Sequence, residues 1–163
     1  MLNDLPEGWY SDEELRLLAA AAAARAKSPA AFVEIGVLRG RSATVLGTFT
    51  DRLILVDDLS MGDYRDEWPA HESEYLTARE AASYVDEVAL LHQDASHALL
   101  PVLEHLRLFL PKIIKGGVVC LHDFFSSTYP GVRAAWTAAT RGQQDSWERT
   151  GYAGTLVVFE RKD

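Results

Sequence analysis

Short apolar runs of strand length alternate along the chain with longer stretches in which apolar and polar residues mix. The runs are nearly continuous, which is typical of parallel strands covered on both faces. They fall at residues 31–35, 53–56, 87–92 and 118–121. The stretches that follow them are predicted to be helices, at about residues 41–49, 74–84, 99–114 and 132–140. This alternation predicts an α/β domain with a mostly parallel, twisted sheet and helices on both faces.

The two ends of the chain depart from this alternation. Ser11, followed three residues later by Glu14, forms a capping box that predicts a helix from Leu15 to about Ala26, within an N-terminal helical segment over residues 1–30. At the other end, residues 146–151 and 155–161 are typical of two strands around a short turn, which predicts a C-terminal antiparallel hairpin.

The clearest candidate site follows the first predicted strand. This strand contains Glu34, the turn after it contains Gly36 and Gly40, and the next helix begins at about Ser42. Glycines let the backbone bend and let a ligand approach it closely. In an open parallel sheet, nucleotide-like cofactors bind at the first strand-to-helix turn. Residue 38 is Leu where a dinucleotide fingerprint has Gly, which disfavours a pyrophosphate cradle and keeps a ligand-free turn as the alternative.

Acidic residues follow the other predicted strands. Asp57 and Asp58 come directly after the run at 53–56, Asp94 follows the run at 87–92, and Asp123 follows the last run. Because the carboxyl ends of parallel strands meet at one edge of a sheet, we expect these side chains to converge there. An acid after the second strand is placed to accept hydrogen bonds from ribose hydroxyls, with a solvated turn acid as the alternative.

Length, charge and cysteine content narrow the classes of function. The 163 residues suit a single domain over 1–163 with a substantial core. A net charge of −8 argues against nucleic acid and anionic membranes as partners. A lone cysteine, Cys120, excludes an internal disulfide, no apolar run could span a bilayer, and the N-terminus lacks the features of a signal peptide. These features predict a cytoplasmic protein.

Three groups of motifs occur in a fixed order. The first is Val33-Glu34-Ile35-Gly36 with Gly40-Arg41-Ser42. The second is His92-Gln93-Asp94-Ala95-Ser96-His97. The third comprises Leu110-Pro111, Gly116-Gly117-Val118 and His122-Asp123-Phe124. In order and spacing, from Gly8 onward, they resemble class I S-adenosylmethionine-dependent methyltransferases, and most of all the family of macrocin-type O-methyltransferases and cephalosporin-hydroxylase-like proteins.

This resemblance implies a Rossmann-like fold, S-adenosylmethionine as the cofactor, and methyl transfer to a hydroxyl of a small molecule such as a natural product or a sugar. The cofactor-binding residues that it implies are Glu34, Gly36, Gly40, Ser42, Asp57 and Asp58. Those on and around the glycine turn would line the methionine part, and Asp57 would bind the ribose.

The resemblance also implies a metal site, because in metal-dependent members the residues matching Asp94, His122 and Asp123 hold a divalent ion. Mg²⁺ prefers oxygen ligands, whereas His122 offers nitrogen. The sequence therefore leaves open Mg²⁺, a transition metal or no ion.

The second acid of the family's Asp-Gly-Asp-His segment is replaced here by Ser96. If that acid is a base in relatives, this chain needs another one. His97 is the natural candidate, because an imidazole titrates near neutral pH. The sequence predicts His97 and Asp94 as catalytic residues, with Asp94 or His122 orienting the base, or with Asp94 and Asp123 binding metal or orienting it.

The segment between Asp57 and Glu87 is short for this fold. It shows one helix and no strand-length apolar run, so the sequence predicts that edge strand three is missing. The loop over residues 59–74 would then cover the adenine as a lid, and the open edge would suit pairing with a second subunit in a homo-oligomer.

Three hypotheses follow. The first is an O-methyltransferase that acts on a small molecule. The second is a relative that binds the cofactor without methyl transfer, with other chemistry or a scaffold role. The third is an unrelated Rossmann-type nucleotide binder, against which Leu38 and the His-Asp pair argue.

Overall fold

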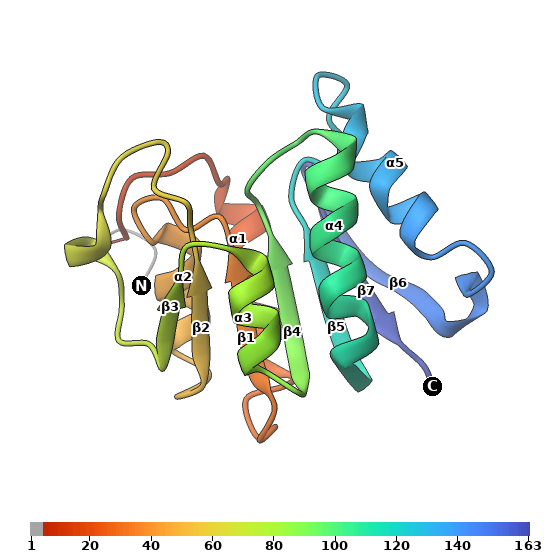
Figure 1. Ribbon diagram of the computed structural model, residues 1–163, viewed down its shortest axis with the longest axis horizontal. Helices are drawn as coiled ribbons and strands as arrows, with labels where there is room; N and C mark the ends of the chain where they lie inside the picture. The colour runs from red at the N-terminus through yellow and green to blue at the C-terminus, as the bar shows by residue number, and fades with distance from the viewer. Residues whose placement is uncertain (1–4) are drawn as a thin grey trace.

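The computed structural model describes residues 5–163, so the first four residues of the predicted domain and of its N-terminal segment lie outside the described part. A seven-stranded sheet runs through the molecule, with helices packed on both of its faces (Figure 1). The strands are β1 Ala31–Ile35, β2 Leu53–Val56, β3 Ser73–Tyr75, β4 Val88–Gln93, β5 Ile113–Leu121, β6 Trp147–Ala153 and β7 Leu156–Arg161. The helices are α1 Asp12–Ala23, α2 Arg41–Gly47, α3 Ala78–Tyr84, α4 Leu99–Phe109 and α5 Pro130–Ala139.

The strand order in the sheet is β3-β2-β1-β4-β5-β7-β6. The strands from β3 to β5 are parallel neighbours, whereas β7 pairs antiparallel with both β5 and β6. This confirms the predicted mostly parallel sheet and the C-terminal hairpin. The strand order reverses between β1 and β4, and open α/β sheets bind ligands beyond the carboxyl ends of the strands at such a point.

The prediction that edge strand three is missing is wrong. Strand β3 is present and pairs in parallel with β2, with Ile54 opposite Ser73 and Val56 opposite Tyr75. It has three residues with partly or fully exposed side chains, so it carries no apolar run that the sequence could reveal. The last residues of the predicted lid loop, 73 and 74, belong to this strand. Helix α3 therefore begins at Ala78 rather than near residue 74.

The predicted helix over 99–114 is also too long. Helix α4 ends at Phe109, a 3₁₀ turn covers Leu110–Lys112, and β5 begins at Ile113. Pro111 lacks the backbone N–H that a continuing helix needs, so the chain leaves the helix there. Of the helices within residues 5–163, none combines the length and the apolar character that crossing a membrane requires.

Two apolar cores lie on opposite faces of the sheet. Side chains of α3, α4 and α5 pack with Val33 and Ile54 on one face, and side chains of α1 and α2 pack with Phe32 and Leu53 on the other. Successive strand residues point to opposite faces, so a strand buried on both faces must be apolar throughout. This explains the continuous apolar runs and fixes the loops at the strand ends.

Candidate active site

The loop after β1 lies tightly against the end of β4. Gly36 has φ +91°, and a Cβ placed on it would lie 2.4 Å from the carbonyl oxygen of Asp94. Gly40 has φ +83° and precedes α2. Between them, Leu38 adopts φ 48°, a conformation uncommon for a residue with a side chain. Only glycine fits at position 36, because both its backbone conformation and the space beside it exclude a side chain.

Asp57, at the end of β2, stabilises this loop through hydrogen bonds. Its Oδ2 accepts hydrogen bonds from the backbone N–H groups of Val37 and Leu38, both at 2.8 Å, and its Oδ1 accepts one from Leu59 at 2.8 Å. An ionised carboxylate offers about four acceptor positions, so one on Oδ1 is left for a ligand. The neighbouring Asp58 is exposed, and hydrogen bonds from Ser60 lower the pKa of its carboxyl.

Glu34 lies beneath the loop and not in its mouth. It is 0% exposed, and its Oε1 accepts hydrogen bonds from the hydroxyl of Ser42 and lies 2.8 Å from Nδ1 of His92. Its Oε2 is buried without a hydrogen-bond partner among the described residues. The arrangement gives Glu34 a supporting role behind the cavity, since it fixes Ser42 and His92 from within the sheet.

Tyr10, in the N-terminal segment, joins this hydrogen-bond network by contacting His92 and Asp94. Its hydroxyl donates to Oδ2 of Asp94 at 2.8 Å and lies 2.7 Å from Nε2 of His92. Burial raises the pKa of Tyr10, and the charges of Asp94 and Glu34 raise it further, so the phenol keeps its proton. The sequence suggested no such role, because Tyr10 lies 84 residues from Asp94.

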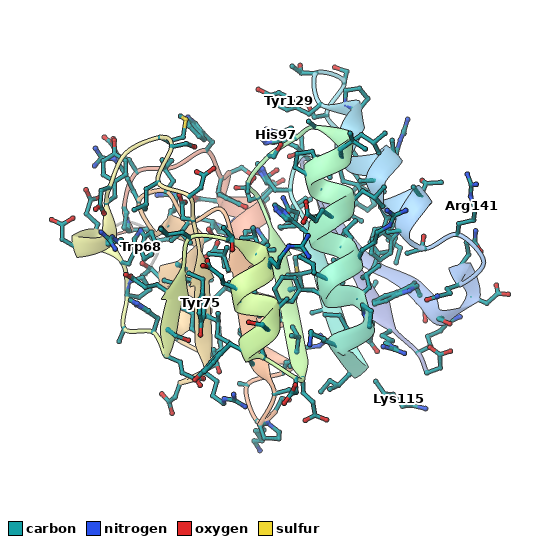
Figure 2. The ribbon with its side chains drawn as sticks, viewed as in Figure 1. Trp68, Tyr75, His97, Lys115, Tyr129 and Arg141 are labelled. Carbon is teal, nitrogen blue, oxygen red and sulfur yellow. The ribbon has the colours of Figure 1, made fainter. Side chains whose placement is uncertain are left out.

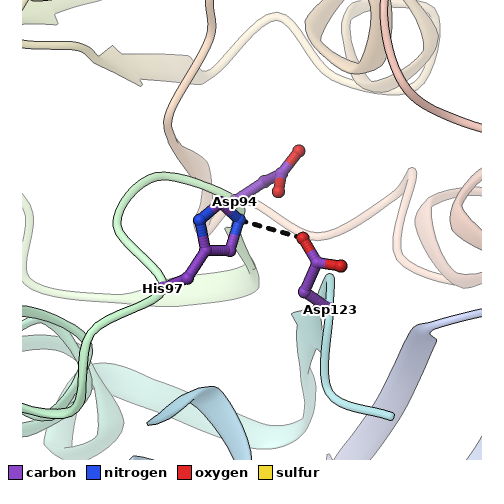
Figure 3. Close-up of side chains that lie close together, drawn as sticks. All are labelled: Asp94, His97 and Asp123. Carbon is purple, nitrogen blue, oxygen red and sulfur yellow. Dashed lines mark ion pairs between the residues drawn. The ribbon is translucent and has the colours of Figure 1, made fainter. Parts of the chain in front are cut away.

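His97 and Asp123 meet at the carboxyl end of the sheet, from the loops after β4 and β5 (Figure 3). Nε2 of His97 lies 2.9 Å from Oδ2 of Asp123. The imidazole stacks on Tyr129 with ring centroids 4.1 Å apart, and Figure 2 shows both side chains near the ends of α4 and α5. Asp123 has φ 57°, an uncommon backbone conformation of the kind that clusters at functional sites. The ring of His97 is therefore held from two sides.

His122 lies deeper, between three carboxylates. Its Nδ1 is 3.0 Å from Oδ1 of Asp94 and 3.3 Å from Oδ2 of Asp123, and its Nε2 is 3.6 Å from Oε1 of Glu14. Burial lowers the pKa of His122, but the neighbouring carboxylates, Asp94 foremost, outweigh it and raise the pKa to about 8. At neutral pH this imidazole carries a positive charge.

The three predicted metal residues, Asp94, His122 and Asp123, lie together, and His97 lies beside them, but this donor set suits Mg²⁺ poorly. Asp94, His97 and Asp123 present ligand atoms within 4.8 Å of one another. This set holds a nitrogen ligand, whereas Mg²⁺ prefers oxygen. The imidazole of His122 also contacts both carboxylates, with Nδ1 3.0 Å from Asp94 and 3.3 Å from Asp123. The cluster is better described as two carboxylates that share one histidine partner, His122.

The glycine loop and the residues at the ends of β2, β4 and β5 line one cavity of about 1300 Å³. Small-molecule sites are typically about 300–1,000 Å³, so it has room for a cofactor and an acceptor together. The sequence-predicted residues that line it are Gly36, Ser42, Asp57, Asp58, Asp94, His97, His122 and Asp123. Glu34 and Gly40 lie behind the wall and shape it. Within the predicted lid loop, Ser60 and Met61 line the cavity, while Trp68 donates its indole N–H to Leu38 and packs behind the loop.

A scan of the sequence against models of protein families finds no match, and a search of curated proteins finds none either. Solved structures do match. CalS11, a TDP-rhamnose 3'-O-methyltransferase of calicheamicin biosynthesis, has a TM-score of 0.70 and 16% identity over 92% of this chain and 79% of that one. TomG from Streptomyces achromogenes, an O-methyltransferase solved with S-adenosylmethionine, has a TM-score of 0.70 and 17% identity over 98% and 84%.

An O-methyltransferase from Bacillus cereus, solved with S-adenosylhomocysteine, has a TM-score of 0.69 and 14% identity over 97% of this chain and 85% of that one. At identities this low, the structural similarity establishes the fold alone, and the strand order agrees with the Rossmann-like, mostly parallel sheet expected from the sequence. The chain has the Rossmann-like fold of class I S-adenosylmethionine-dependent methyltransferases.

Proposed function

We propose that this protein is an S-adenosylmethionine-dependent methyltransferase that methylates a hydroxyl group of a small molecule. The observation that carries the proposal is a large cavity with a glycine loop on one side and the His97–Asp123 pair on the other. The glycine loop and Asp57 suit the cofactor, and the pair suits removal of a proton from the acceptor. The structural neighbours CalS11 and TomG are O-methyltransferases, which supports O-methylation of a small molecule as the reaction class.

When bound, the cofactor supplies an electrophilic methyl group on its sulfonium. The protein aligns the acceptor with that methyl group, and alignment accounts for much of the acceleration in such displacements. His97 takes the hydroxyl proton of the acceptor as general base. Because Asp123 lies against Nε2, the ring nitrogen left for the acceptor is Nδ1. Asp123 also stabilises the imidazolium that forms.

Asp94 has a positioning role in this proposal. Its Oδ2 accepts a hydrogen bond from the hydroxyl of Tyr10, and its Oδ1 lies 3.0 Å from Nδ1 of His122. In this proposal no step is assigned to a divalent ion, because His122 lies against both carboxylates and Asp123 orients His97.

Binding and turnover test the proposal separately. Calorimetric titration with S-adenosylhomocysteine should show saturable binding in the micromolar range. Purified protein should then transfer a labelled methyl group from S-adenosylmethionine to members of a panel of phenols, sugars and hydroxylated natural products. Absence of cofactor binding would contradict the proposal as a whole.

The second candidate is a cofactor-binding protein without methyl transfer. It is favoured by Ser96, which stands where the resembling family has an acid and whose hydroxyl here accepts a hydrogen bond from the backbone of Ala98 at 3.3 Å. Binding of S-adenosylhomocysteine with no transfer to any acceptor would support this candidate over the first.

A further inference from the structure

Three arginines line the cavity, and two of them are neutralised. Nη1 of Arg39 lies 3.2 Å from Oε1 of Glu67, and Arg79 forms an ion pair with Glu104. Arg41 has no carboxylate within ion-pair distance among residues 5–163. Of the arginines at the cavity, Arg41 is therefore the one without an ion pair among residues 5–163.

The side chain of Arg41 is held in place by neutral groups. Its Nη1 donates a hydrogen bond of 2.8 Å to the carbonyl oxygen of Pro6, and its stem packs against Gly8, where a Cβ would lie 2.8 Å from Cδ of Arg41. Its Nε is buried and has no hydrogen-bond partner among the described residues. A guanidinium held by neutral groups keeps a charge that a carboxylate in the cavity would compensate.

The rest of the cavity is acidic. The carboxylates of Glu7, Asp57 and Asp58 line it and form no ion pair among residues 5–163. The proposed cofactor carries two positive groups, a sulfonium and an ammonium, and a single negative group, the carboxylate of its methionine part. Acidic walls suit the positive groups and repel the carboxylate, which therefore needs a cation of its own.

The position of Arg41 suits this role. It directly follows Gly40 at the end of the glycine loop and precedes Ser42, and both Arg41 and Ser42 line the cavity. The residues on and around this loop are those expected to line the methionine part of the cofactor. A guanidinium also matches a carboxylate geometrically, because it can donate two parallel hydrogen bonds.

We infer that Arg41 binds the carboxylate of the methionine part of the cofactor. The inference rests on the proposed function, since it assigns a residue within the same site. The N-terminal segment then contributes to cofactor binding, because Pro6 and Gly8 hold the guanidinium of Arg41 in place and thereby complete the cofactor site.

The test compares two ligands that differ in the carboxylate alone. S-Adenosylhomocysteine and its decarboxylated analogue, S-adenosyl-3-thiopropylamine, are titrated by calorimetry into the wild-type protein, Arg41→Gln and Arg39→Gln. The wild type and Arg39→Gln should prefer S-adenosylhomocysteine. Arg41→Gln should lose roughly 10- to 100-fold in affinity for S-adenosylhomocysteine and little for the analogue, because a hydrogen-bonded charge of this kind contributes about that factor.

The outcomes separate the inference from the proposed function. Equal losses for both ligands, or no loss for either, would overturn the role of Arg41 while the cofactor site stands. Absence of S-adenosylhomocysteine binding by the wild type would overturn the proposed function and this inference with it. Arg41→Met keeps the apolar stem that packs on Gly8, and it serves as a second neutral variant if Arg41→Gln fails to fold.

Discussion

Nε2 of His97 lies 2.9 Å from Oδ2 of Asp123, although the two residues come from different loops, one after β4 and one after β5. The contact fixes which ring nitrogen faces the acceptor. Tyr129 stacks on the same ring and limits its rotation. An imidazole oriented in this way by a carboxylate is the usual form of a histidine that acts as a general base.

Replacing His97 by Gln should therefore remove the base and leave the cofactor site intact. We expect methyl transfer to fall by about 10²- to 10⁴-fold, the usual contribution of general base catalysis. The affinity for S-adenosylhomocysteine, measured by calorimetry, should change little. Asp123→Asn is the matched variant: Asn tolerates the positive φ of this position, so its smaller loss of turnover would report the lost charge. Full turnover by His97→Gln would remove the proposed base.

The parts of the fold that the sequence predicts well are those that packing decides. Strands β1 and β2 have the predicted bounds, because a strand buried on both faces must be apolar along its whole length. Strand β3 was missed, because it has three residues and no fully buried side chain. The start of β5 was missed, because Ile113 and Ile114 suit the end of an apolar helix as well as a strand.

The residues of the candidate site can likewise be divided into those whose positions the sequence predicts and those whose positions it does not. The positions of Asp57, Asp94 and Asp123 could be predicted, because the topology brings the ends of parallel strands to one edge. The contacts of Tyr10 with Asp94 and of Glu14 with His122 could not, since they join distant segments through side-chain geometry. Glu34 was expected in the wall of the cavity, and its contacts with Ser42 and His92 place it behind that wall instead.

Gly36 offers a test of the close approach between the glycine loop and β4. In Gly36→Ala, the new Cβ would meet the backbone of Asp94 at 2.4 Å, so strain in φ and a steric clash act together. Gly142→Ala is the matched control, because Gly142 has φ +80° and nothing lies within 4 Å of its Cβ position. Strain alone costs on the order of 1–3 kcal/mol. We expect a larger loss of unfolding free energy for Gly36→Ala, measured by urea denaturation, together with loss of S-adenosylhomocysteine binding. Equal losses for the two variants would show that the contact with Asp94 is not tight.

The pH dependence of stability should report the charge on His122. Its pKa rises from 6.5 to about 8 on folding, because the carboxylates of Asp94, Asp123 and Glu14 outweigh the effect of burial. A pKa that folding raises gives stability that is complete below pH 6.5 and is lost as pH rises through about 8. The shift corresponds to roughly 2 kcal/mol. Unfolding free energies measured in chelator between pH 6 and 9 should therefore fall by about this amount. His122→Gln should flatten this part of the profile, and an unchanged profile in that variant would assign the effect to another group.

We expect the imidazole of His122 also to determine how the protein responds to Mg²⁺. In the wild type, the imidazole of His122 lies against Asp94 and Asp123, so a few millimolar Mg²⁺ should change neither the melting temperature nor the affinity for S-adenosylhomocysteine. His122→Asp would exchange that positive charge for a third carboxylate beside the other two, which leaves like charges together in the absence of metal. We expect this variant to melt at a lower temperature in EDTA and to recover on addition of Mg²⁺, because the site then offers the oxygen ligands that this ion prefers. His122→Asn serves as the control: it removes the positive charge, adds no negative one, and should respond much less. A wild-type protein that binds the cofactor more tightly with Mg²⁺ would contradict the assignment of His122 as the cationic partner of these carboxylates.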